Sequence, residues 1–364
     1  MVVVGRIGVF SLRNSIICAV DFLYRREAHV VWECVYPALA SGTIKAMKIF
    51  VTGGAGYIGS ITNKLLVEQG HDTIVFDNLS RGHREAVGKT PLLVGDLTNL
   101  SEINEVFEQH DFDAVIHFAA LSLAGESMEK PYEYFHNNLF GGLNLLETMQ
   151  KHNCKKIIFS STSAVYGYPK RVPIVEEEAI APVSVYGASK HMVEEMIGWY
   201  EKIYGIKSVI LRYFNAAGAM LDGSLGEDHE SESHIIPVAI AVALGKQKTF
   251  ELFGDDYETT DGTCIRDYIH VVDLADAHIK ALELPSSEII NLGVGRGYSN
   301  KEVLAVVSKI TGRKLPVEVK PRRLGDPAKL WADNAKAKRV LSWEPKYSDI
   351  ETIVSSALKW HKKN

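Results

Sequence analysis

The sequence is poor in cysteine and has no closely spaced cysteine pair. Its four cysteines, Cys18, Cys34, Cys154 and Cys264, are scattered over 364 residues without any CxxC motif. This spacing supports neither a cysteine-ligated zinc site nor a disulfide framework. We therefore expect no bound metal and a reducing, cytoplasmic location.

Blocks of one charge and long apolar runs are also missing. Basic residues number 40 and acidic residues 45, and no lysine- or arginine-rich block indicates a nucleic-acid surface. Near the N-terminus the apolar patch 16–20 is followed at once by Asp21, Arg25 and Arg26. These charges interrupt the patch before a membrane span or the apolar part of a signal peptide is complete. We expect no nucleic-acid partner and no membrane segment.

What the chain does contain is an alternation of short apolar runs and helical patterns, beginning at Met47. Such alternation predicts an α/β fold, a Rossmann-type doubly wound parallel sheet with a smaller mixed α/β substrate domain. The expected strands are rich in Val, Ile and Phe with little alternation, as strands buried on both faces should be. They cover residues 48–52, 73–76, 92–95, 114–118, 156–160 and 208–213.

The clearest expected helix covers residues 186–204. Apolar residues such as Val193 and Ile197 recur in it at spacings of three and four, which predicts one buried face. Its other face is charged and carries Lys190, Glu194, Glu195 and Glu201.

A glycine-rich motif, TGGAGYIG at residues 52–59, stands between the first expected strand and a helix. Glycines let backbone N–H groups approach a pyrophosphate, and a helix N-terminus favours anions. Asp77, 18 residues after Gly59, would accept hydrogen bonds from ribose hydroxyls, which favours NAD over NADP. Asp96 follows the third strand and either faces the adenine or is a solvated loop carboxylate.

A second motif, YGASK, places Tyr186 and Lys190 four residues apart, on one face of the expected helix. A nearby ammonium favours the phenolate, so the pair can supply a base for a sugar hydroxyl. Thr162, in the hydroxyl-rich end of the fifth strand, would hydrogen-bond the reacting oxygen. Alone, the YxxxK spacing is common by chance in helices; beside the glycine motif it indicates catalysis.

In their order and spacing these motifs resemble the extended short-chain dehydrogenase/reductase family and, within it, the UDP-glucose 4-epimerase branch. The resemblance runs from Met47 to about residue 360 and rests on TGGAGYIGS, HFAA, FSSTSAVYG, YGASK, LRYFN, RDYIHV and NLG. It implies tightly held NAD, oxidation of carbon 4 of a UDP-hexose to a ketone, rotation of that ketone, and return of the hydride to its other face. The expected reaction interconverts UDP-glucose and UDP-galactose.

The resemblance also implies which residues hold each ligand. Tyr186 would be the base, Lys190 would tune it and contact the nicotinamide ribose, and Thr162 would stand for a serine. The implied cofactor residues are Gly53, Gly56, Tyr57, Ile58, Gly59, Asp77, Asn78, Asp96, Leu97, Phe118, Ala119, Asn137, Asn138, Tyr186, Lys190 and Tyr213. The implied substrate residues are Ser127, Thr162, Asn215, His234, Ile235, Phe253, Arg266, Arg323, Asp326 and Leu330. Among these, Arg266 and Arg323 would clamp the diphosphate, and Phe253 would stack on the uracil.

Three positions depart from the family pattern. Ser122 stands where some members carry a lysine that contacts the cofactor, and His234 stands where others have an asparagine beside the nucleotide. Leu330 stands where a tyrosine closes the sugar pocket, so the pocket is expected to have room for N-acetylated sugars as well.

Other functions stay open. A UDP-glucuronate type of 4-epimerase differs only in its hexose. A nucleotide-sugar 4,6-dehydratase would need an Asp-Glu pair where this chain has Ser163 and Ala164, which cannot do acid/base work. A non-enzymatic NAD-sensing regulator would lose Tyr186 or Lys190, and both are present.

For the domains we expect a loose or artefactual extension at 1–46, an NAD-binding domain at 47–216 and a UDP-sugar-binding domain at 217–364. Elements around 266–293 are expected to pack back on the NAD-binding domain. By resemblance, helices at 139–149 and 189–204 would pair two chains into a homodimer.

Overall fold

The computed structural model describes residues 45–229, 232–323 and 325–363. The expected N-terminal extension therefore lies outside the described residues, apart from its last two. Residues from Ala46 onwards form one compact unit. Within the described part of the chain, no helix has the length and apolar character needed to cross a membrane.

A seven-stranded sheet with the order β11-β6-β5-β4-β1-β2-β3 forms the centre of this unit. Every neighbouring pair in it is parallel, and the order 3-2-1-4-5-6 within it is that of a doubly wound nucleotide-binding sheet. Its strands are β1 (Lys48–Thr52), β2 (Asp72–Asp77), β3 (Leu92–Val94), β4 (Ala114–His117), β5 (Lys156–Thr162), β6 (Lys207–Tyr213) and β11 (Glu288–Leu292). The fold class expected from the sequence is confirmed.

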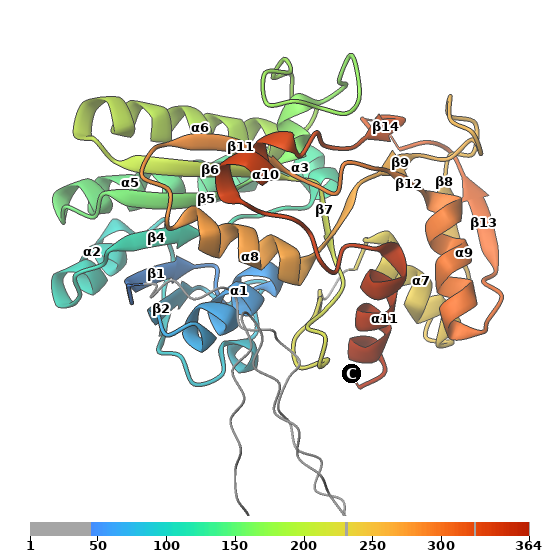
Figure 1. Cartoon of the computed structure of the whole chain (residues 1–364), viewed down its shortest axis with the longest axis horizontal. Helices are drawn as coiled ribbons and strands as arrows, with labels where there is room; N and C mark the ends of the chain where they lie inside the picture. Colours follow the sequence, from blue (N-terminus) through green and yellow to red (C-terminus); the bar gives the residue numbers. More distant parts are fainter. Residues whose placement is uncertain (1–44, 230–231, 324, 364) are drawn as a thin grey trace, which may run out of the picture. The chain divides into compact units, whose positions relative to one another are not determined.

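Helices cover both faces of the sheet (Figure 1). On one face lie α1 (Tyr57–Glu68), α8 (Val271–Ala281) and α10 (Ala335–Leu341). On the other lie α2 (Leu100–Gln109), α5 (Gly141–Lys151) and α6 (Val185–Tyr204). Alternate residues of a strand point to opposite faces: Phe50 packs into the second core and its neighbour Val51 into the first. Both faces of the sheet are therefore shielded from water, which explains why each strand is a continuous run of apolar residues.

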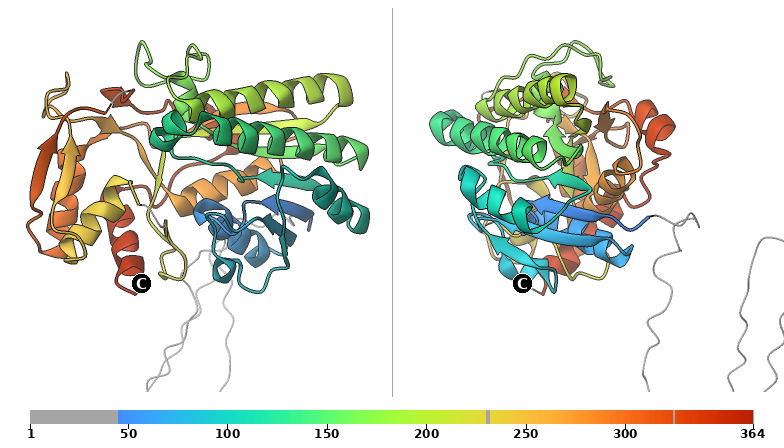
Figure 2. Two further views of the ribbon diagram at one scale, coloured as in Figure 1. Left: turned by 180° about the vertical axis from the view of Figure 1, so that it is seen from behind. Right: turned by 90° about the vertical axis from the view of Figure 1, so that its left-hand side faces the viewer.

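A smaller region beside the sheet has a core of its own (Figure 2). It contains α7 (Ile235–Ala243), α9 (Asn300–Thr311) and α11 (Ile350–His361), together with the parallel pair β8 (Phe250–Phe253) and β13 (Val317–Lys320). The chain crosses back between these elements, because β11 and α8 follow α7 in sequence and pack in the main sheet region.

Short strands and helical turns join the two regions. β7 (Asn215–Ala217) pairs with β10 (Tyr268–His270), and β9 (Ile265–Arg266) lies between β12 (Tyr298–Ser299) and β14 (Lys329–Leu330). The remaining helical segments are η1 (Arg84–Val87), α3 (Ala124–Glu129), α4 (Pro131–Phe135), η2 (His136–Phe140) and η3 (Ser163–Tyr166). These strands bring Asn215, Arg266 and Leu330 to the edge where the parallel strands end.

Candidate active site

The turn between β1 and α1 is too tight for any residue larger than glycine at two positions. Gly53 has a φ of +72°, and a Cβ there would lie 2.5 Å from the backbone nitrogen of Ala119. A Cβ on Gly59 would lie 2.2 Å from the carbonyl oxygen of Gly53. α1 then begins without a side-chain cap at Gly56. The turn therefore presents backbone, and no side chain, to a ligand.

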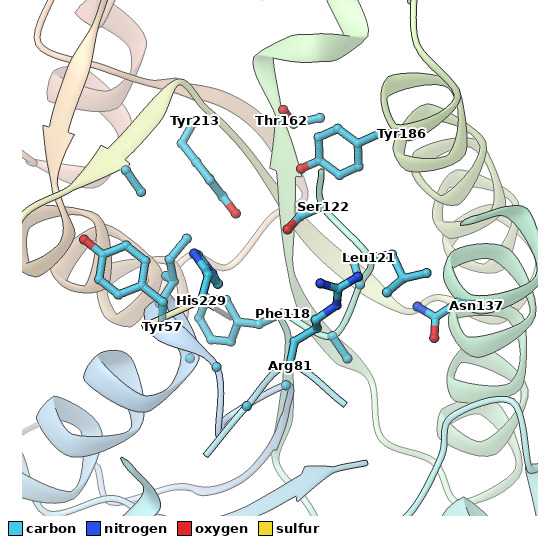
Figure 3. A pocket seen from close by; sticks show the side chains of 18 of the residues that line it. Tyr57, Arg81, Phe118, Leu121, Ser122, Asn137, Thr162, Tyr186, Tyr213 and His229 are labelled. Atoms are coloured by element: carbon cyan, nitrogen blue, oxygen red, sulfur yellow. The ribbon is translucent and has the colours of Figure 1, made fainter. Parts of the chain in front are cut away.

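This turn forms one end of a cavity of about 400 Å³ at the carboxyl edge of the sheet (Figure 3). Nearly all of the expected cofactor residues line it: Gly53, Gly56, Tyr57, Ile58, Gly59, Asp77, Asn78, Asp96, Leu97, Phe118, Ala119, Asn137, Tyr186 and Tyr213. Of the expected substrate residues, Thr162, Asn215, His234, Arg266 and Leu330 line it. The structure thus gathers residues spread over almost 280 positions around one space.

Asp77 ends β2 with its carboxylate held in place. Oδ2 accepts the N–H of Ala55 at 3.0 Å and Oδ1 accepts the N–H of Leu79 at 2.9 Å. Beside it, the amide of Asn78 donates to Asp96 at 3.0 Å. Burial alone would raise the pKa of Asp96, but hydrogen bonds from Asn78 and Thr98 outweigh it and lower that pKa. The Asp96 carboxylate is therefore charged at neutral pH, and both aspartates line the cavity.

α6 carries Tyr186 into the opposite end of the cavity. The helix starts at a side-chain cap, because Ser184 Oγ accepts the N–H of Gly187 at 3.1 Å. It ends at Gly205, which has a left-handed φ of +71°, the conformation that glycine adopts without strain. In the cavity the side chains of Tyr186 and Thr162, the last residue of β5, lie close together (Figure 3).

The environment of Tyr186 favours the neutral phenol. Burial raises the pKa of Tyr186 well above its ordinary value, and the nearby Tyr213 raises it further. A hydrogen bond with the Thr162 hydroxyl acts in the opposite direction and lowers this pKa. The tuning of this pKa by Lys190, which the sequence predicted, stays a prediction.

Lys190 lies behind the cavity wall. Its side chain is buried, with Nζ 4.6 Å from the centre of the Phe159 ring. Burial lowers the pKa of Lys190 to about 7, although Glu194 raises it in part. The same buried region holds His117, whose pKa falls to about 3 through burial and the repulsion of Lys190.

Two residues of the charged face of this helix, Lys190 and Glu194, are buried. Glu194 is compensated by Arg212 on β6, whose Nε and Nη2 donate to it at 3.0 Å and 2.6 Å. The Ser161 hydroxyl also donates to Glu194. Helical periodicity cannot reveal a compensating charge from a strand 18 residues away.

Several expected ligand residues do not line the cavity. Ser127 is buried and uses its hydroxyl oxygen to accept the N–H of Tyr186 at 3.1 Å. Asn138 donates to Ser189 at 2.9 Å and so holds η2 against α6. Both side chains position α6. Ile235 begins α7 and is likewise not part of the cavity wall.

Three further substrate candidates are engaged with other side chains. Arg323 lies over the Phe253 ring, with 3.9 Å between the guanidinium carbon and the ring centre. Asp326 forms an ion pair with Arg266. Of the four residues in these two pairs, only Arg266 lines the cavity.

Sequence reasoning missed other residues of the cavity wall, notably Arg81, Glu227 and His229. Arg81 is held by an ion pair with Glu126, in which its Nη2 donates to both carboxylate oxygens, at 3.0 and 2.9 Å. Glu227 and His229 fall in residues 218–232, a stretch rich in glycine and acidic residues. The repeated His and Glu there were the signal that could have found them.

Comparison with known proteins gives consistent matches. The model of the NAD dependent epimerase/dehydratase family matches residues 49–293. The UDP-glucose 4-epimerase of Halalkalibacterium halodurans is 50% identical over 322 residues, which covers 87% of this chain and 96% of that protein. The crystal structure of UDP-glucose 4-epimerase from Brucella ovis in complex with NAD superposes with a TM-score of 0.84 at 46% identity, covering 86% of this chain and 98% of the other. The enzyme from Bifidobacterium longum, in complex with NAD+ and UDP, has a TM-score of 0.83 at 40% identity and covers 87% and 98%.

Proposed function

The chain belongs to the NAD dependent epimerase/dehydratase family, and we propose that it interconverts UDP-glucose and UDP-galactose by inverting carbon 4, with NAD as its bound cofactor. It is an isomerase acting on a UDP-sugar, as the resemblance in the sequence implied. The observation that carries this proposal is the single cavity whose wall contains the glycine turn and Asp77 at one end and Tyr186 with Thr162 at the other.

The residues present fit NAD. The turn at Gly53 and Gly59 has no room for a Cβ, so backbone can approach a pyrophosphate closely. The carboxylate of Asp77 is suited to ribose hydroxyls and repels a 2′-phosphate. When bound, NAD supplies the hydride acceptor and, in the return step, the hydride donor.

We assign the proton transfer to Tyr186. Its oxygen would take the proton of the hydroxyl on carbon 4 and give it back after the sugar has turned. The Thr162 hydroxyl stabilises the phenolate, since it lowers the pKa of Tyr186. Lys190 lies four residues further along α6, and a positive charge there would favour the same anion.

Inversion at carbon 4 requires the sugar to present either face to the cofactor. The protein should therefore bind the substrate mainly through its nucleotide. Asn215 and Arg266 line the cavity away from the glycine turn, and a guanidinium suits a diphosphate. Loose contacts to the hexose would let the ketone rotate without leaving. Arg323 and Phe253 stack on each other. To contact the nucleotide they would have to give up this stacking.

The cavity argues against a dehydratase. Ser163 and Ala164 follow Thr162 in the cavity wall, and neither side chain can act as the acid or base of an elimination. Leu330 is also in the wall, and we include N-acetylated UDP-sugars among the substrates on the ground that leucine is smaller than tyrosine.

Three further assignments belong to the proposal. Residues 47–216 would bind NAD and residues 217–364 the UDP-sugar. Two chains would pair through α5 and α6, which lie side by side and expose apolar side chains (Figure 2). A cytoplasmic location stays a prediction, to be checked by cell fractionation.

The test uses purified full-length protein and UDP-galactose without added NAD, with UDP-glucose formation followed by chromatographic separation of the two UDP-sugars. We expect turnover by the unmodified chain and a loss of about 100-fold or more in kcat for Tyr186→Phe. Tyr200→Phe, on the same helix with its hydroxyl on Glu147, is the matched control and should keep its activity. Turnover of Tyr186→Phe at the unmodified rate, with NAD still bound, would remove the proposed base.

A further inference from the structure

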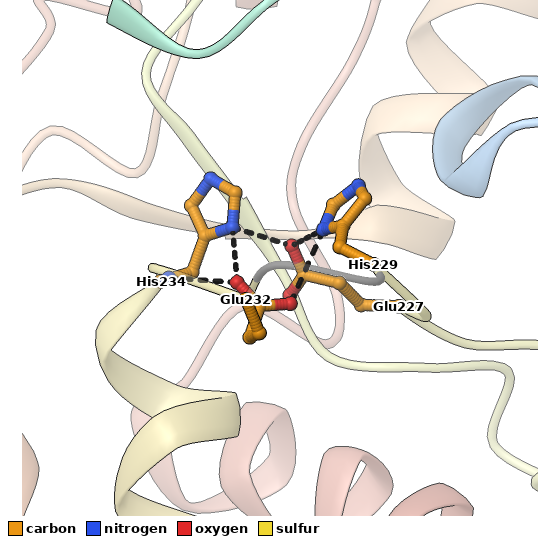
Figure 4. A group of neighbouring side chains, drawn as sticks. All are labelled: Glu227, His229, Glu232 and His234. Atoms are coloured by element: carbon orange, nitrogen blue, oxygen red, sulfur yellow. Dashed lines mark hydrogen bonds and ion pairs between the residues drawn. The ribbon is translucent and has the colours of Figure 1, made fainter. Parts of the chain in front are cut away.

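Two histidines and two glutamates meet at the cavity wall just before α7 (Figure 4). They are Glu227, His229, Glu232 and His234, and each offers one donor atom to a group in which all four atoms lie within 4.8 Å of one another. Glu227, His229 and His234 also line the cavity. The group contains no cysteine. Cysteine spacing, from which we expected no bound metal, therefore could not reveal it.

Each histidine uses the same ring nitrogen to face both carboxylates. Nδ1 of His229 lies 3.4 Å from Glu227 Oε1 and 3.2 Å from Glu232 Oε2. Nδ1 of His234 lies 2.9 Å from Glu227 Oε1 and 2.7 Å from Glu232 Oε1. A ring nitrogen carries at most one proton, which can point well at only one oxygen. Hydrogen bonds therefore serve about half of these contacts, which involve both oxygens of Glu232. A cation between the two ring nitrogens, Glu227 Oε1 and one oxygen of Glu232 would engage all four side chains.

We propose that Glu227, His229, Glu232 and His234 bind one Zn²⁺ ion. Imidazole nitrogens and carboxylate oxygens are ligands of zinc, which prefers four of them in a tetrahedron. With bonds of 2.0–2.2 Å the donor atoms stand about 3.4 Å apart. The two His229 contacts are already close to that separation, and the two shorter His234 contacts need to open by less than about 1 Å.

Charge supports the same occupant. The two carboxylates bring two negative charges into a place where Glu227 is buried, and both face the two imidazole rings. A divalent cation neutralises both carboxylates and leaves the histidines neutral, so no charge remains unpaired in the buried group.

Neighbouring groups already hold the proposed ligands in place. The backbone N–H groups of Ser233 and His234 both donate to Glu232 Oε1 at 2.7 Å. The indole of Trp360 on α11 donates to the carbonyl oxygen of Glu227 at 3.0 Å. Such contacts orient metal ligands. Four protein ligands leave no open coordination position, which is typical of a structural zinc site.

The ion would also fix the proton of His234, a point that rests on the proposed function. Coordination through Nδ1 leaves Nε2 protonated, so this cavity residue would be a permanent hydrogen-bond donor toward the nucleotide. Loss of zinc should then raise the KM for the UDP-sugar several-fold and change kcat less.

The first measurement is the metal content of untagged full-length protein by elemental analysis, followed by zinc titration after chelation. We expect one zinc per chain, and an intense visible absorption when Co²⁺ replaces it, since tetrahedral Co²⁺ absorbs strongly. His229→Asn and Glu232→Gln should each weaken zinc affinity about 100-fold or more, because losing a ligand costs at least as much as losing an outer contact. His83→Asn, which removes a contact to Asp228 beside the group, is the control and should bind zinc normally.

Binding below about one zinc per ten chains, a weak octahedral-type Co²⁺ spectrum, or unchanged affinity in both ligand variants would overturn the proposal. Equal weakening in His83→Asn would do the same, since it would mean that loop packing and not coordination was measured. The outcome is independent of catalysis: Tyr186→Phe should be inactive and still bind one zinc.

Discussion

Tyr186 and Lys190 each lie where burial disfavours their charged form. Burial raises the pKa of the phenol and lowers that of the ammonium to about 7. The spacing of the two residues predicted that a nearby ammonium favours the phenolate of Tyr186. In the structure Lys190 packs on Phe159, and Thr162 is the neighbour that lowers the phenol pKa. The hydroxyl at position 162 is therefore central to the proton transfer that we propose.

Leu330 allows a test of substrate range by one side chain. It lines the cavity and lies on β14 beside Arg266. If the leucine leaves space for an acetamido group, the unmodified enzyme should convert UDP-N-acetylglucosamine as well as UDP-glucose. Leu330→Tyr should lose about 10–100-fold in kcat/KM for the N-acetyl sugar and little for UDP-glucose, in parallel assays of both substrates. Leu330→Met is the size-matched control.

The idea would be wrong if the unmodified enzyme left UDP-N-acetylglucosamine untouched. It would also be wrong if Leu330→Tyr lowered the turnover of both sugars equally, since that would indicate general damage to the cavity and not loss of space.

At the scale of elements, the six expected strands are all present to within two residues of their predicted ends. They could be predicted because both faces of the sheet are covered, so each strand is a continuous apolar run. The glycine turn and Asp77 were predictable for a related reason: local backbone geometry fixes their spacing along the chain. β11 has a comparable apolar pattern but follows a long crossover, and its place beside β6 depends on tertiary packing.

The charged face of α6 could not be predicted in this way. Periodicity places Glu194 beside Ile197, three residues further on, at the edge of the apolar face, but solvent is the ordinary environment of a glutamate. Arg212, from the neighbouring strand, makes burial possible. The stacking of Arg323 on Phe253 could not be predicted for the same reason, and neither could the group of two histidines and two glutamates. Each forms between side chains that come together only in the folded chain.

The buried pair predicts an unequal response to two adjacent substitutions in α6. Glu194→Gln leaves the Arg212 guanidinium without its counter-ion in a dry site, which costs about 3–5 kcal/mol of unfolding free energy. Glu195→Gln changes a side chain that is 64% exposed and should change stability by less than about 0.5 kcal/mol. Urea denaturation followed by circular dichroism measures both. Equal midpoints for the two variants would contradict the role given to the Arg212–Glu194 pair in joining α6 to the sheet.

At the scale of the whole molecule, α5 and α6 are neighbouring helices that both leave large apolar side chains exposed. Among the exposed large apolar residues of the described chain, five lie on these two helices, with between 39% and 62% of their surface exposed: Leu143 on α5 and Met192, Trp199, Ile203 and Tyr204 on α6. Both helices also bury an opposite face against the sheet. Exposed apolar side chains on two adjacent helices are what an interface needs, and two helices from each of two chains can form a four-helix bundle.

We therefore expect a dimer of about twice 40.3 kDa in light scattering at micromolar concentration. The double variant Trp199→Glu with Ile203→Glu places two negative charges in the proposed bundle of each chain, four at the interface, and should run as a monomer, because desolvating unpaired carboxylates is costly. Tyr168→Glu alters an aromatic residue of similar exposure, 57%, away from both helices and should remain dimeric. A monomeric unmodified chain, or a double variant that stays dimeric, would place the interface elsewhere. Since Tyr186 lies on the same helix as the proposed interface, we expect the monomeric variant to lose thermal stability and part of its turnover together.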